Sequence, residues 1–159
     1  MYNRILLPTD GSTEMEPVVE HAAAVADRDD ALLHGLYVVD STSVASLPME
    51  TGWDGISGLL YDAGVEALND VERIVDDRAE VERIVTEGRP SAEIVEHARE
   101  DDCDLIVMGT HGRGGIDRLL LGSVAERVVR RSPVPVMTVR VGEPGREDPK
   151  RDPEQKMRA

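Results

Sequence analysis

The chain has only two lysines and no phenylalanine among its 159 residues. Its 32 acidic residues outnumber its 18 basic residues, which gives a formal net charge of −14. Both lysines, Lys150 and Lys156, lie beyond residue 141, where acidic and basic residues balance. The acidic excess therefore belongs to residues 1–141. This part offers no basic face for a phosphate backbone, which argues against nucleic-acid binding.

The single cysteine, Cys103, has no partner for a disulfide within the chain. Asp102 and Asp104 flank it, and neighbouring carboxylates raise the pKa of a thiol, so we expect no reactive nucleophile there. Signal peptides, transit sequences and long apolar runs are also missing. We therefore expect a cytoplasmic protein without a membrane span.

The shortage of lysine and phenylalanine leaves arginine as the cation and Val, Leu, Ile and Ala as the core residues. Solvated carboxylates keep such a protein soluble, but they repel one another when salt is removed. This composition predicts a salt-rich cytoplasm, such as that of a halophilic archaeon. An ordinary acidic protein of a mesophile is the alternative.

Short apolar segments alternate with patterns of helical spacing along the chain, which predicts a single α/β domain with a parallel sheet and helices on both faces. The expected strands cover residues 4–7, 32–39, 81–86, 105–108 and 134–141. Charges at Glu82 and Arg83 suit an exposed sheet edge, and Pro135 confines the last strand to an edge as well. We expect residues 40–57 to form a long loop, and residues 142–159 to form a charged, flexible tail.

The stretch from residue 105 to residue 124 carries the chemistry. A buried strand ends at Gly109, and Gly109 and Gly112 would allow a tight turn with positive φ. After nine intervening residues, Gly122 precedes Ser123, which has the spacing of a capping box with Glu126 at the start of a helix over 124–131. Backbone N–H groups from the turn and from the helix start would converge on one point, as in anion sites. The pattern predicts a phosphate cradle, and the alternative is that the glycines serve only a tight connection.

Two other phosphate motifs fit this stretch poorly. It contains no G-x-x-x-x-G-K-[ST] sequence, which excludes a P-loop. Gly112 and Gly114 begin a dinucleotide fingerprint, but Asp117 occupies the position of its third glycine. That run also follows the fourth expected strand rather than the first.

Three segments together resemble the universal stress protein family, in its nucleotide-binding branch. They are residues 5–12 (I-L-L-P-T-D-G-S), the glycine pattern from Gly109 to Ser123, and residues 134–139 (V-P-V-M-T-V). The resemblance implies a family domain over residues 1–141, with residues 142–159 outside it. It also implies a doubly wound, Rossmann-like sheet of the adenine nucleotide alpha hydrolase type, with strand order 3-2-1-4-5. Strands 1 and 4 would then be neighbours across a switch point, where ligands of such sheets bind.

The resemblance further implies ATP or a related adenine nucleotide as the ligand, with Mg²⁺, and a homodimer formed through the edge strand over 136–141. Val136, Met137, Val139 and Val141 would supply exposed apolar surface at that edge. The predicted nucleotide contacts are Pro8, Thr9, Asp10, Val38, Met108, Gly109, His111, Gly112, Arg113, Gly122, Ser123 and Val124.

Several of these residues have alternative roles. The family implies that the Val38 backbone pairs with the adenine edge. Asp10 would accept from ribose hydroxyls or hold waters on Mg²⁺, or would merely cap the first helical turn. Arg113 suits a terminal phosphate but is also a typical exposed loop arginine. His111 is the only tempting catalyst, and no carboxylate nearby in sequence would orient it.

Two classes of function follow from these residues. The first is an ATP-binding homodimer that acts as a stress-responsive switch with little or no turnover. The second is a slow ATPase or a nucleotide-dependent transferase on the same fold, which the fold alone does not exclude. A stress protein without nucleotide is a third class, and the intact glycine pattern argues against it.

Overall fold

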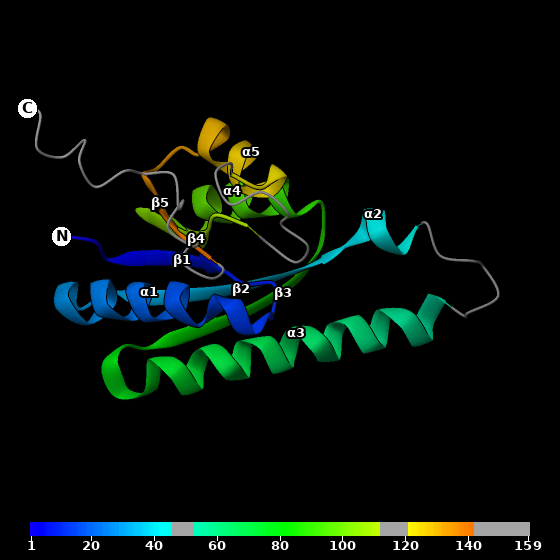
Figure 1. The fold of residues 1–159 in the computed structure, drawn as a ribbon, viewed down its shortest axis with the longest axis horizontal. Coiled ribbons are helices and arrows are strands. Elements are labelled where there is room, and N and C mark those ends of the chain that lie inside the picture. Colours follow the sequence, from blue (N-terminus) through cyan, green and yellow to red (C-terminus); the bar gives the residue numbers. More distant parts are fainter. Residues whose placement is uncertain (46–52, 112–120, 142–159) are drawn as a thin grey trace, which may run out of the picture.

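A five-stranded parallel sheet with helices on both faces forms the protein, as the sequence predicts (Figure 1). The structure is a computed structural model, and it describes residues 1–45, 53–111 and 121–141. Its strands are β1 (Arg4–Pro8), β2 (Leu32–Asp40), β3 (Val81–Gly88), β4 (Leu105–Gly109) and β5 (Val136–Val139). Their order in the sheet is β3-β2-β1-β4-β5, so β1 and β4 are neighbours although they lie far apart in the sequence.

The helices divide between the two faces of the sheet (Figure 1). They are α1 (Glu16–Asp29), α2 (Ser41–Val44), α3 (Trp53–Val75), α4 (Pro90–Glu100) and α5 (Ser123–Arg131), with 3-10 turns at Thr13–Met15 and Asp76–Arg78. Alternate residues of β1 serve opposite faces: Ile5 and Leu7 pack under α1 and α3, and Leu6 packs under α4 and α5. This two-sided burial explains why β1 and β4 consist of unbroken apolar runs.

The expected loop over residues 40–57 is wrong in part, because α2 and the beginning of α3 lie within it. The Asp40 carboxylate starts α2 by accepting from the backbone N–H of Thr42. The first turns of α3 extend beyond the strands in Figure 1, and Leu59 is 70% exposed. A helical segment with no core to face has no reason to show an apolar stripe, which is why periodicity missed it. Trp53 begins this helix rather than standing in a loop.

The sheet edges, Cys103 and His97 differ in their exposure to solvent. β3 and β5 form the two edges of the sheet, and Glu82 and Arg83 are exposed, as predicted. Cys103 is buried; burial, with Asp101 and Asp104 nearby, raises the pKa of its thiol to about 11, the direction that its acidic neighbours predict. His97 on α4 is partly buried, with Nδ1 3.2 Å from Asp101 Oδ2.

The edge strand β5 is shorter than the predicted segment and less exposed. Val139 is only 9% exposed and belongs to the core beneath α1, and Met137 and Val141 pack against that core. The expectation that these side chains form an apolar surface for a partner is therefore wrong for Val139. In the part of the chain that the structure describes, no helix is both long and apolar enough to cross a membrane. The expected tail over 142–159 lies outside the described residues.

Candidate functional site

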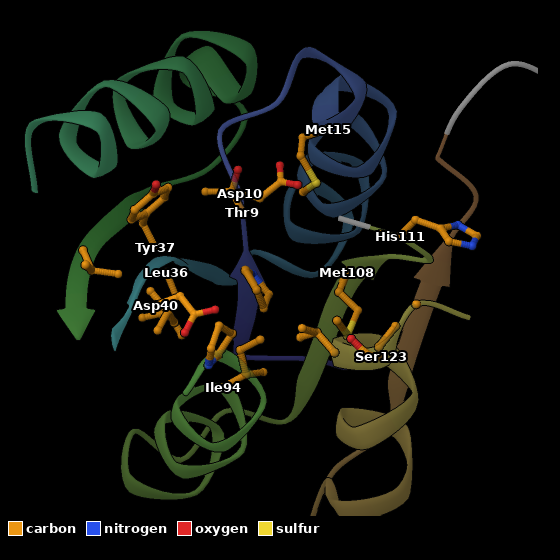
Figure 2. Close-up of a pocket in the computed structure, with 18 of the residues that line it drawn as sticks. Thr9, Asp10, Met15, Leu36, Tyr37, Asp40, Ile94, Met108, His111 and Ser123 are labelled. Atoms are coloured by element: carbon orange, nitrogen blue, oxygen red, sulfur yellow. The ribbon is translucent and has the colours of Figure 1, made fainter. Parts of the chain in front are cut away.

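A cavity of about 620 Å³ opens at the carboxyl ends of β1, β2 and β4, where the strand order reverses (Figure 2). Such a switch point is where doubly wound sheets bind ligands. Ten of the twelve predicted contact residues line it: Pro8, Thr9, Asp10, Val38, Met108, Gly109, His111, Gly122, Ser123 and Val124. The other two, Gly112 and Arg113, lie outside the described residues.

The turn after β1 is held by its own side chains. The Gly11 N–H donates to Thr9 Oγ1 at 3.1 Å, and the Ser12 N–H donates to Asp10 Oδ1 at 2.9 Å. Gly11 has a φ of 76°, in the left-handed region that favours glycine. These bonds fix Asp10 at the end of the strand, beside the cavity.

Asp10 uses only one of its carboxylate oxygens in this turn. Its other oxygen, Oδ2, is buried and has no hydrogen-bond partner among the described residues. Leaving a buried carboxylate oxygen unsatisfied costs free energy. The free oxygen is therefore available to a hydroxyl, a water or a cation in the cavity.

Val38 presents its backbone to the same cavity. The Leu36 carbonyl accepts from the Thr9 N–H at 2.9 Å, and Pro8 with Leu36 is the last pair between β1 and β2. Backbone polar groups point alternately to the two sides of a strand, so those of Val38 face the same side as those of Leu36. Because β1 has already turned away at that point, the Val38 N–H and C=O are directed into the cavity, where one donor and one acceptor stand side by side.

Helix α5 points its N-terminal end at the cavity, which Ser123, Val124 and Ala125 line. The predicted capping box is wrong: Gly122 is the N-cap, Ser123 is the first helical residue, and no side chain caps the helix. The first intrahelical bond runs from the Glu126 N–H to the Gly122 carbonyl, so the preceding N–H groups have no intrahelical acceptor. An uncapped helix start at a cavity is suited to bind an anion.

Gly109 and Gly122 are the two glycines of the motif that the structure describes. The reason for glycine at these positions is not the predicted tight turn with positive φ. Gly109 and Gly122 both lack a positive φ. A side chain on Gly109 would stand 2.6 Å from Val141 Cγ2, and one on Gly122 would stand 3.3 Å from the Thr110 carbonyl oxygen. Close packing of the chain on itself, rather than a strained turn, therefore opposes a side chain strongly at Gly109 and more weakly at Gly122.

His111 lies at the rim of the cavity, with its ring directed away from Asp10 and Asp40 (Figure 2). Its Nδ1 is 3.0 Å from the Thr110 hydroxyl, which also accepts from the Val141 N–H at 3.2 Å. These contacts tie His111 to the end of β5. Among the described residues, these hydrogen bonds of His111 include no carboxylate.

Other lining residues were not anticipated from the sequence. They are Met15, Leu36, Tyr37, Val39, Asp40, Ser43, Leu60, Pro90, Ile94 and Ala125. Partial burial raises the pKa of Asp40, but hydrogen bonds from Thr42 and Ser43 together outweigh it and hold that pKa below its ordinary value. Asp40 is thus a fixed negative charge at the mouth. The sequence could have identified Asp40 as a lining residue from its position at the end of β2, because ligands of doubly wound sheets bind at the carboxyl ends of the strands.

The fold and the site together define an α/β protein of the doubly wound class with an open anion-binding end. The chain belongs to the universal stress protein family, whose model matches residues 1–140. Universal stress protein MJ0531 of Methanocaldococcus jannaschii is 42% identical over 141 residues, which cover 88% of this chain and 83% of that protein.

Solved structures agree with this membership. The structure of MJ0577, a universal stress protein of Methanocaldococcus jannaschii, has a TM-score of 0.79 and 30% identity, covering 88% of this chain and 96% of that one. A universal stress protein solved in complex with cAMP has a TM-score of 0.63 and 28% identity, covering 87% of this chain and 97% of that one. A relative with this fold therefore binds an adenine nucleotide.

Proposed function

We propose that this chain is an ATP-binding universal stress protein, and that the cavity at the switch point holds the nucleotide. One observation supports the proposal above all: three kinds of binding group surround a single cavity. The Val38 backbone offers a donor beside an acceptor, Asp10 offers a free carboxylate oxygen, and α5 offers unpaired N–H groups.

Each group suits one part of an adenine nucleotide. The edge of adenine carries an N–H donor next to a ring-nitrogen acceptor, which matches the Val38 carbonyl and N–H. The N–H groups of Ser123 and Val124 suit phosphate oxygens. Gly112 and Arg113 would add donors on the far side of the phosphates, as the sequence predicts. Adenine-nucleotide binding by the relative solved with cAMP supports the same assignment.

Mg²⁺ fits this site only as an ion that the phosphates bring with them. Mg²⁺ is usually held by one or two carboxylates together with substrate phosphates. Asp10 supplies one such carboxylate through its unpartnered Oδ2. The described residues contain no cluster of three His, Cys, Asp or Glu side chains that could hold a metal ion. When bound, the ion would neutralise phosphate charge, and Asp10 would orient it directly or through water.

Ser123 allows a sharp test of the phosphate site, because it is the first residue of α5. Proline is well tolerated at that position and removes its N–H, and Gly122 has the extended ψ of 162° that suits a residue before proline. We expect Mg-ATP to bind the wild type at micromolar concentration, about −8 kcal/mol. Ser123→Pro should weaken binding by about tenfold or more, the loss of one hydrogen bond to a charged group.

The matched control is Ser123→Ala, which keeps the N–H and loses only the hydroxyl. Titration calorimetry of the three proteins, with circular dichroism to show that α5 is retained, separates the two groups. Equal affinities of the wild type and Ser123→Pro would contradict binding of phosphate at the start of α5.

We further propose that the bound nucleotide turns over slowly or not at all. Phosphoryl transfer needs a positioned nucleophile as well as charge neutralisation. His111 is bound to the Thr110 hydroxyl and points away from Asp10, so it is badly placed to activate water. We expect fewer than about one turnover per minute, far below ordinary enzyme rates.

The alternative is a slow ATPase or a nucleotide-dependent transferase on the same fold. Incubation of the protein with labelled ATP and Mg²⁺, beside a His111→Ala variant, measures the product directly. Turnover of about one per second that is lost in the variant would replace the switch by an enzyme.

The remaining parts of the proposal concern the setting in which the site works. We propose a cytoplasmic homodimer that pairs through β5 and responds to nucleotide, in a halophilic cell. The edge of β5 is unpaired in the described part of the chain, which supports the homodimer, and the acidic excess on residues 1–141 supports the halophilic cell.

A further inference from the structure

His34 is a buried titratable group that the nucleotide site does not use. It lies near the start of β2, whereas the cavity opens at the other end of that strand. The residue is only 4% exposed. Both of its ring nitrogens are buried and lack a hydrogen-bond partner among the described residues.

A carboxylate faces each of the two ring nitrogens. Nε2 of His34 is 3.7 Å from Glu82 Oε2 on the neighbouring edge strand β3. Nδ1 is 3.9 Å from Oδ2 of Asp101, the residue that ends α4. His34 therefore stands between an edge strand and the end of a helix, with an acceptor on either side.

The other charged groups around this site belong to α4 and β1. His97 on α4 contacts the same Asp101 oxygen through Nδ1 at 3.2 Å. The Arg4 guanidinium donates to the backbone carbonyl of Asp101 at 3.0 Å. The surroundings of His34 are therefore acidic. The His97 imidazole contacts the same Asp101 carboxylate oxygen as His34, and the Arg4 guanidinium lies nearby.

Neither neutral form of the imidazole fits this geometry. A neutral ring has one N–H donor and one lone pair, so in either tautomer a lone pair faces a carboxylate oxygen. Only the doubly protonated ring presents a donor to both carboxylates. Burial opposes a charged ring, but a carboxylate on each side and the C-terminal end of α4 both favour a cation.

We propose that His34 is a proton-operated latch between β3 and α4. With the second proton bound, the ring donates through Nε2–H to Glu82 and through Nδ1–H to Asp101, and each contact shortens by roughly 0.5–1 Å to reach hydrogen-bond distance. When that proton leaves, a lone pair of the His34 ring faces either the Glu82 or the Asp101 carboxylate. That contact becomes repulsive, and the link between β3 and α4 is lost. The latch stabilises the fold while that proton is bound and is released when the proton leaves. Histidine side chains in general change charge between about pH 5 and 8. The latch does not depend on which ligand occupies the cavity.

Urea unfolding at about pH 5.5 and about pH 8, on either side of that range, tests the latch. Because many carboxylates also titrate, the informative quantity is the difference between wild type and His34→Gln. Acidification should stabilise the wild type relative to this variant by about tenfold in the unfolding equilibrium constant, as one hydrogen bond to a charged group would. His21→Gln is the matched control, because His21 is exposed and should follow the wild type at both pH values.

Two further measurements keep the proposal testable if His34→Gln fails to fold. Glu82→Gln changes a side chain that is 58% exposed, and it should reduce the response of the wild type to acid. Nuclear magnetic resonance of the wild-type ring nitrogens should show His34 gaining its second proton within the same range. Parallel pH responses of the wild type and the variants, or a His34 ring that stays neutral throughout, would overturn the proposal.

Discussion

At the scale of single residues, two glycines of α3 have opposite surroundings. A side chain on Gly64 would stand 2.7 Å from Cδ1 of the Tyr37 ring, whereas one on Gly58 would meet nothing within 4 Å. Alanine favours a helix over glycine by about 1 kcal/mol in the absence of other contacts. We therefore expect Gly58→Ala to raise the free energy of unfolding by about 1 kcal/mol. Gly64→Ala should lower it by about 1–3 kcal/mol, because the ring and α3 must move apart.

The two substitutions are controls for each other, since they add the same methyl group to the same helix. Urea unfolding of both variants measures the difference. A Gly64→Ala variant that is as stable as Gly58→Ala would show that Tyr37 is not packed against α3 as described. Tyr37 also lines the cavity, so a displaced ring should be accompanied by weaker nucleotide binding.

Single residues also show where prediction from the sequence reaches its limit. The motif identified Gly109 and Gly122, but their function as contact points for Val141 and Thr110 depends on atoms from other segments. For Asp10 the sequence left a structural and a ligand-binding role open; Oδ1 holds the turn after β1, and Oδ2 has no hydrogen-bond partner among the described residues. Local spacing identifies residue types, whereas the partner of each atom is set by the tertiary packing.

At the scale of elements, β5 leaves one side of its backbone unpaired among the residues that the structure describes. The carbonyls of Pro135 and Val139 accept from β4 and the residue after it, so the odd-numbered residues face inward. Thr138 therefore directs its N–H and C=O outward, and its side chain is exposed. An open strand edge of this kind is a template for pairing with a second copy.

We expect the wild type to elute as a dimer at micromolar concentration and Thr138→Pro to elute as a monomer. Proline removes an outward N–H, and it is tolerated at an edge because the bonds to β4 remain. Thr138→Val is the matched control, since it keeps the N–H and should stay dimeric. Sizing chromatography with light scattering gives the masses. A wild type that is monomeric, or a Thr138→Pro variant that is still dimeric, would contradict pairing through β5.

Val139 is unsuitable for this test, although the sequence singles it out. Its side chain is buried beneath α1, so an aspartate there would unfold the subunit before it affected a dimer. The sequence predicted five strands and their edges well, because two-sided burial leaves a strong apolar signal. It missed the start of α3 and misassigned the cap of α5, because those ends make few apolar contacts. The strand order came from the family resemblance, since a parallel sheet of five strands does not fix its own order.

At the scale of the whole molecule, part of the acidic excess lies on neighbouring surfaces. Helices α1 and α3 pack side by side over one face of the sheet (Figure 1). Both helices expose carboxylates to solvent, among them Glu16, Glu20, Asp27, Asp62, Glu66 and Asp70. Arginines offset only some of these charges, as in the pairs of Arg78 with Glu20 and Arg73 with Asp70. Folding therefore brings like charges together, which opposes the packing of α1 on α3.

Dissolved salt should relieve this repulsion, because the Debye length falls from about 10 Å at 0.1 M to about 3 Å at 1 M. We expect the melting temperature in molar KCl to exceed that in dilute buffer by roughly 10 °C, equivalent to about 3 kcal/mol for a domain of this size. Thermal melts followed by circular dichroism measure the difference, with sucrose at matched osmolality as the control for effects other than charge. A quadruple variant with Glu16, Asp27, Asp62 and Glu66 changed to the corresponding amides should need less salt to reach the same melting temperature. Melting temperatures that do not change with KCl would remove the proposal that this protein works in a salt-rich cell.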